Sequence, residues 1–171
     1  VSLPGILYNV PSRTALNMDA ATTLKLAEVP NIVGVKEASS DADQIAYVIN
    51  GAPEDFNVWS GNDNEIFPTM ATGGYGIVSV AGNIISGQIK QMMGLILEGD
   101  VEAAAAEHLR LLPIFNALFI ITNPIPVRYA LNRSGFNVGP ARLPMIPDAG
   151  ELKVFSDRFD PVMDQYSIDL K

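Results

Sequence analysis

The first 80 residues alternate short apolar runs with amphipathic segments, and this alternation restricts the folds open to the chain. Four runs rich in valine and isoleucine are expected to be strands: residues 5–9, 32–38, 56–60 and 76–80. Between them lie segments with helical spacing, long enough for crossovers between parallel strands: residues 14–29, 41–50 and 65–72. Asp41 and Gln44 form a possible capping box at the start of the second segment. The pattern predicts an α/β fold whose parallel sheet has its helices outside.

After the fourth strand the pattern becomes entirely helical. Helices are expected over residues 85–98, 101–119 and 126–133, with a weaker tail from residue 151, and Gly99 and Gly135 are plausible helix stops. A complete (β/α)8 barrel needs eight units in about 250 residues. The sequence therefore predicts half a TIM barrel of four βα units over residues 1–98, followed by a helical region over residues 99–171. An open doubly wound sheet fits less well, because its glycine fingerprint should follow the first strand and NVPS stands there instead.

Composition excludes several classes of protein. The net charge of −8 lacks the basic footprint that nucleic acids or anionic membranes attract, so neither is an expected partner. The absence of cysteine rules out disulfides and thiol chemistry and suits a reducing compartment, so we expect a cytoplasmic location. The most apolar stretch, residues 111–127, is interrupted by prolines and asparagines and is too short for a membrane span. The first residues, VSLP, have neither an initiator methionine nor the charged-then-apolar pattern of a signal peptide, and we expect the chain to begin within a longer fold.

Lys36 stands in a strand that is otherwise suited to burial on both faces. Side chains alternate along a strand, so Lys36 shares a face with Gly34, while Val33, Val35 and Glu37 take the other. If that face lines the barrel, Gly34 leaves room beside the amine. Only a neutral amine attacks a ketone, and desolvation favours the neutral form. Lys36 is therefore a candidate Schiff-base nucleophile; the alternative is a lysine that snorkels from a strand end.

Tyr8 occupies the equivalent position on the preceding strand. Parallel pairing would bring its phenol near Lys36, where a hydroxyl could relay protons; a barrel-lining aromatic is the simpler interpretation. Arg13 lies four residues past the strand end, where its guanidinium could hold a carboxylate or simply be solvated. Glycines around Gly61 and Gly74 suggest a close ligand or tight turns. The lone His108 has no neighbour at metal-binding spacing, so no metal site is expected.

Several stretches together resemble the dihydrodipicolinate synthase family, within the wider group of pyruvate-dependent Schiff-base lyases. They are residues 8–14 (YNVPSRT), 33–39 (VGVKEAS), 60–63 (SGND), 73–80 (GGYGIVSV) with Asn83, 123–128 (NPIPVR) and 142–144 (RLP). The resemblance runs to about residue 147 and is poor over residues 153–171. The SRT ending of the first motif favours the synthase over the sugar-acid lyases.

The resemblance implies that pyruvate condenses with aspartate semialdehyde in the pathway to diaminopimelate and lysine. Lys36 would carry pyruvate as an imine and Tyr8 would move protons. Arg13 would help hold the semialdehyde carboxylate, and Gly61 and Val78 would contact the bound keto acid. Val78 shares a face with Gly76 and Val80 in the expected strand. No metal or organic cofactor is implied, because the imine itself is the electron sink.

The family pattern also includes four earlier βα units, which carry a threonine pair of the proton relay, a second tyrosine and the residues that bind inhibitory lysine. The chain is thus expected to be the C-terminal half of such a fold. Its unpaired sheet edges predict a homo-oligomer or association with the missing N-terminal half. Two alternatives stay open: a related pyruvate lyase that acts on sugar acids, and a non-catalytic half-barrel assembly module.

Overall fold

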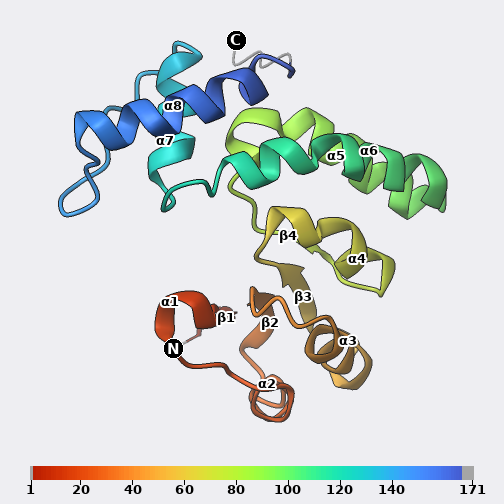
Figure 1. Cartoon of the computed structure of the whole chain (residues 1–171). Helices are drawn as coiled ribbons and strands as arrows, with labels where there is room; N and C mark the ends of the chain where they lie inside the picture. Colours follow the sequence, from red (N-terminus) through yellow and green to blue (C-terminus); the bar gives the residue numbers. More distant parts are fainter. Residues whose placement is uncertain (1, 167–171) are drawn as a thin grey trace. The chain divides into compact units, whose positions relative to one another are not determined.

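The computed structural model describes residues 2–166 and divides into two compact units (Figure 1). The first unit contains residues 2–79 together with 96–99, and the second contains residues 80–95 together with those from 100 onward. The domain division expected between residues 98 and 99 stays a prediction.

The first unit is built on a four-stranded parallel sheet with the order β1-β2-β3-β4. The strands are Gly5–Asn9, Ile32–Glu37, Asn57–Ser60 and Gly76–Ile77. All four predicted strands are confirmed, and β1 has the predicted bounds. The fourth was predicted to reach residue 80, which is wrong: pairing with β3 involves only Gly76 and Ile77, because β3 itself ends at Ser60.

The crossover helices of this unit are α2 (Ala20–Ala27), α3 (Ala42–Gly51) and α4 (Ile66–Ala71), and α4 follows a 3-10 turn at Asp63–Glu65. The first of these helices was predicted to begin at residue 14, which is wrong, because α2 begins at Ala20. Residues Pro11–Thr14 form a separate short helix, α1, which ends at Ala15 in the left-handed region with φ of 56°. The side chain of Asp19 then accepts a hydrogen bond from the Thr22 N–H and starts α2.

One face of the sheet is covered and the other is open. Helices α2, α3 and α4 lie on the same side of the sheet (Figure 1). Buried side chains of this covered face and its helices form a core, and the partly buried Leu7 and Met18 pack against it. The core residues are Ala27, Val35, Val48, Phe56 and Val58. On the opposite face Ile6 and Tyr8 are each 53% exposed. Strand alternation therefore separates a buried face from one that carries Tyr8 and Lys36.

The second unit is helical. Its elements are α5 (Gly82–Glu98, whose last residues group with the first unit), α6 (Val101–Ala117), α7 (Ile125–Arg133) and α8 (Ala149–Met163). The predicted start of α5 at residue 85 coincides with a kink, where Ile85 has non-helical φ and ψ of −132° and 39°. The predicted C-terminal tail is a full helix, α8, and a capping box between Asp148 and Glu151 forms its first turn. Gly99 and Gly135 end helices with φ of 81° and 86°, as predicted.

The interior of the second unit is aromatic and aliphatic. Tyr129 packs edge-to-face on Phe155 and Phe159, with ring centroids 5.2 and 5.9 Å away, and its hydroxyl donates to Asp160 at 3.0 Å. His108 is buried in α6, and burial lowers its pKa, which favours a neutral structural imidazole. Within residues 2–166 the structure contains no helix with the length and apolar character of a membrane span.

Candidate active site

Lys36 and Tyr8 lie side by side at the carboxyl ends of two paired strands. They are register partners between β1 and β2. The Lys36 Nζ sits over the face of the Tyr8 ring, 4.1 Å from its centroid. Lys36 is half-buried and Tyr8 is exposed, so both are within reach of a small molecule. The predicted proximity is confirmed, and the contact is a cation–π interaction when the amine is charged. Their catalytic roles stay predictions.

The space beside Gly34 is filled rather than open. A Cβ at this position would lie closer than 3.0 Å to the Asn57 carbonyl oxygen and to the ring of Trp59. Trp59 is the register partner of Lys36 on β3 and also packs edge-on against Tyr75, with 5.4 Å between ring centroids. The prediction that Gly34 leaves room beside the amine is therefore wrong: the glycine accommodates a tryptophan that the sequence reasoning overlooked.

Gly61 lies against Lys36. Its N–H donates to the Glu37 carbonyl oxygen at 2.6 Å. A Cβ added at this glycine would be 3.2 Å from the Lys36 Cε and only 2.6 Å from the Ala38 Cβ. A side chain here would therefore press on the lysine. The position of Gly61 agrees with its predicted place near a ligand carried by Lys36, whereas Gly73, with φ of 104°, belongs to a tight turn.

Arg13 and Val78 follow strand ends of the same sheet. Arg13 lies exposed in the last turn of α1, four residues beyond β1, and its N–H donates to the Val10 carbonyl at 2.9 Å. Val78 lies one residue past the short strand β4 and is 44% exposed. Its N–H donates to the Ser60 carbonyl at 3.0 Å, which holds Val78 against the end of β3. Their roles in substrate binding stay predictions.

A buried polar network lies on the covered face directly behind Tyr8 and Lys36. Asn9 and Glu37 are register partners, and they are 2% and 0% exposed. The Glu37 carboxylate accepts hydrogen bonds from the side-chain amides of Asn9 and Gln44 and from the Ser39 N–H. The Gln44 side-chain oxygen accepts from the Asn17 Nδ2, and the Asp41 N–H donates to the Ser39 Oγ at 3.3 Å, so only the half of the predicted capping box in which the Asp41 carboxylate accepts from the Gln44 N–H forms.

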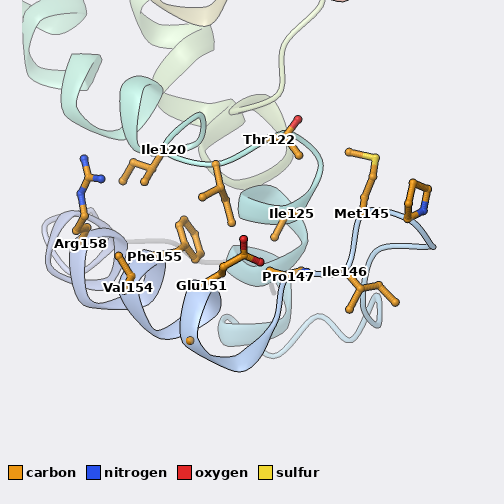
Figure 2. Close-up of a pocket in the computed structure, with 13 residues that line it drawn as sticks. Ile120, Thr122, Ile125, Met145, Ile146, Pro147, Glu151, Val154, Phe155 and Arg158 are labelled. Atoms are coloured by element: carbon orange, nitrogen blue, oxygen red, sulfur yellow. The ribbon is translucent and has the colours of Figure 1, made fainter.

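The second unit has a separate groove of about 690 Å³ (Figure 2). Figure 2 shows Phe155 and Val154 on one wall and Ile120 and Ile125 on another, with Glu151 and Arg158 as its charged lining groups. The five predicted site residues do not line it. Among residues 2–166 there is also no cluster of three acidic or histidine side chains suited to a metal ion. All five predicted site residues belong to the first unit.

Comparison with known proteins identifies the family. Residues 1–155 match the model of the dihydrodipicolinate synthetase family. The 4-hydroxy-tetrahydrodipicolinate synthase of Dehalococcoides mccartyi strain CBDB1 is 52% identical over 143 residues, which are 84% of this chain and 48% of that protein. The corresponding enzyme of Symbiobacterium thermophilum is 54% identical over 152 residues, or 88% of this chain and 51% of that one.

Solved structures of dihydrodipicolinate synthases also match this chain. The dihydrodipicolinate synthase of Aquifex aeolicus superposes with a TM-score of 0.92 at 37% identity, covering all of this chain and 58% of that one. The enzyme of Cyanidioschyzon merolae, solved with lysine bound, gives 0.89 at 40% identity over 95% of this chain and 54% of that one. The chain thus spans about half the length of the relatives it matches. It belongs to the dihydrodipicolinate synthetase family.

Proposed function

We propose that this chain carries the Schiff-base centre for the condensation of pyruvate with aspartate semialdehyde. The observation that supports this most directly is the Lys36 amine held over the Tyr8 ring at the carboxyl ends of β1 and β2, in a chain of this family. We place this sheet in the C-terminal half of a (β/α)8 barrel, whose active sites form at the carboxyl ends of the strands.

The reaction begins at the Lys36 Nζ. The neutral amine attacks the ketone carbon of pyruvate, and the resulting carbinolamine loses water to form an imine. Loss of a methyl proton gives an enamine, whose carbon then attacks the semialdehyde carbonyl. Tyr8 is placed to supply and accept the protons of carbinolamine formation and dehydration. The protonated imine draws electrons from the adjacent carbon, so the proposal needs no metal or organic cofactor.

The remaining predicted residues are assigned to binding. Arg13, on α1 next to the end of β1, holds the carboxylate of the semialdehyde, since a guanidinium can bind a carboxylate with two hydrogen bonds. Gly61 gives the keto acid room against the Lys36 stem. Val78 contributes an apolar contact from the loop after β4.

The open face and free edges of the sheet suit an association. Among the described residues, β1 and β4 are the outer strands of the sheet. We propose that a homo-oligomer, or a polypeptide with the four other βα units, covers them, as edge pairing would satisfy their backbone groups. A cytoplasmic location remains a prediction from composition.

Replacing Arg13 with alanine tests the choice of second substrate. The chain is incubated with pyruvate and aspartate semialdehyde and then reduced with borohydride. The adducts on the peptide that contains Lys36 are quantified by mass spectrometry. We expect the pyruvate adduct to change little and the heavier, condensed adduct to fall about 10- to 100-fold, because a hydrogen-bonded charged group contributes about 1.5–3 kcal/mol. Arg158→Ala, in the second unit, is the control. Equal loss of both adducts would contradict the role of Arg13.

The sugar-acid alternative differs only in the second aldehyde. With N-acetylmannosamine in place of the semialdehyde, we expect no condensed adduct on Lys36. A condensed adduct with the sugar and none with the semialdehyde would assign the chain to the sugar-acid lyases instead.

A further inference from the structure

We propose that Glu37 is a positioning residue, which fixes Lys36 and Tyr8 through the buried network that it forms with Asn9 and Gln44. This inference rests on the proposed function, because it assigns to the network the task of aiming the Schiff-base amine. Glu37 itself faces away from the site and touches no substrate, since strand alternation puts its side chain opposite that of Lys36.

The carboxylate of Glu37 is fully buried and held by neutral donors. It accepts hydrogen bonds from the Asn9 Nδ2 at 3.0 and 3.2 Å, from the Gln44 Nε2 at 3.1 Å and from the Ser39 N–H at 2.8 Å. Burial of a polar group costs free energy, and replacing such a group and its hydrogen-bond partners with apolar groups of the same shape can be nearly neutral or stabilising. Core stability alone therefore does not explain a carboxylate at this place.

The network is closed by further hydrogen bonds around Asn9. Its Oδ1 accepts from the Met18 N–H at 3.0 Å, and its Nδ2 donates to the Asn17 Oδ1 at 2.8 Å. The Asn17 Nδ2 in turn donates to the Gln44 Oε1 at 2.8 Å. Side chains from β1, β2, α3 and the loop before α2 are therefore tied together behind the two candidate catalytic residues.

Each candidate catalytic residue directly precedes a member of this network. Lys36 is followed by Glu37, whose side chain is held by the network and whose carbonyl accepts from Gly61. Tyr8 is followed by Asn9, whose carbonyl accepts from the Ala38 N–H at 2.9 Å. With both the backbone and side chains of residues 9 and 37 held, the Cα–Cβ directions of Tyr8 and Lys36 have little freedom. Such control of orientation is worth up to about 100-fold in rate.

The test replaces Glu37 with glutamine, which keeps the shape but turns an amide donor toward the donors of Asn9 and Gln44. Trapping by pyruvate and borohydride is followed over time at increasing pyruvate concentration. We expect the rate constant at saturating pyruvate to fall about 10-fold or more, while the half-saturating concentration changes less than about twofold, because the network orients the amine without contacting pyruvate. Glu54→Gln, on the exposed surface of the same unit, is the matched control and should react at the original rate.

A swap of the two side chains should restore the reaction. Gln44→Glu alone places two carboxylates face to face and should also slow trapping. In the double variant Glu37→Gln/Gln44→Glu, one carboxylate again meets one amide, and we expect a rate constant within about threefold of the original. A merely volume-filling role would not produce this recovery, so a double variant as slow as the two single variants would overturn the proposal.

Unfolding and mispositioning have different signatures. A less stable variant lowers the fraction of chain that reacts and its melting temperature, whereas the proposal requires a lower rate constant in folded protein. A folded Glu37→Gln chain that traps pyruvate at the original rate would overturn the proposal.

If the unaltered chain forms no adduct, the proposed function fails, and acetic anhydride labelling of the lysines tests the role of Glu37 separately. The Lys36 to Lys25 labelling ratio should then change at least about threefold in Glu37→Gln, and an unchanged ratio would overturn the inference.

Discussion

Replacing Tyr8 with phenylalanine is expected to slow imine formation at Lys36 by about 10²- to 10⁴-fold, the usual contribution of a positioned general acid–base group. The substitution keeps the ring beneath the Lys36 Nζ, which lies 4.1 Å from the ring centroid, and removes only the hydroxyl. Tyr8 is 53% exposed, so the free energy of unfolding should change by less than about 0.5 kcal/mol. The loss should therefore appear in the rate and not in stability.

The measurement is the time course of pyruvate trapping by borohydride, read by intact mass, with thermal unfolding recorded in parallel. Tyr47→Phe is the control, because Tyr47 is 69% exposed on α3 and lies away from the sheet face that carries Lys36. If Tyr8→Phe traps pyruvate as fast as the Tyr47 control, the phenol plays no part in proton transfer.

Replacing Gly34 with alanine is expected to destabilise the first unit by about 3 kcal/mol, the upper end of the usual cost of overpacking. The new methyl group would overlap the Asn57 carbonyl oxygen, which belongs to the backbone of the paired strand and cannot rotate away. It would also strike the ring of Trp59, the only tryptophan of the chain, so denaturation followed by tryptophan fluorescence reports directly on this contact.

Gly87→Ala is the matched control for this change. Gly87 lies in α5, and a Cβ there would have no heavy atom within 4 Å. Because alanine favours helix over glycine by up to about 1 kcal/mol, this control should leave stability unchanged or raise it slightly. A Gly34→Ala chain as stable as the original would mean that the β2–β3 contact at Trp59 is looser than the structure has it.

The strands and the central pair of residues could be predicted because local signals carry them. Apolar runs of five to seven residues mark the sheet, and the equivalent places of Tyr8 and Lys36 in consecutive parallel strands make them neighbours. The same signals predicted the wrong ends for some helices and strands. Ala15 in the left-handed region separates α1 from α2, and the short overlap with β3 ends β4 at Ile77.

The features that were missed depend on contacts between residues distant in sequence. Whether the space beside Gly34 is open depends on Trp59, 25 positions later, which the register of β2 and β3 places there. Glu37 could be placed on the face opposite Lys36, but its donors come from β1 and α3. A useful signal was present: Asn9 and Glu37 are polar residues at equivalent ends of two consecutive parallel strands, which predicts that they are neighbours on the same face.

Lys36 is the proposed Schiff-base nucleophile of this chain. Incubation of the folded 171-residue protein with pyruvate and borohydride, followed by intact-mass analysis and peptide mapping, tests it most directly. We expect one reduced pyruvate adduct per chain, confined to Lys36 and abolished by Lys36→Met. No adduct in a demonstrably folded sample, or adducts spread over Lys25, Lys90 and Lys153, would contradict it and favour a non-catalytic half-barrel module.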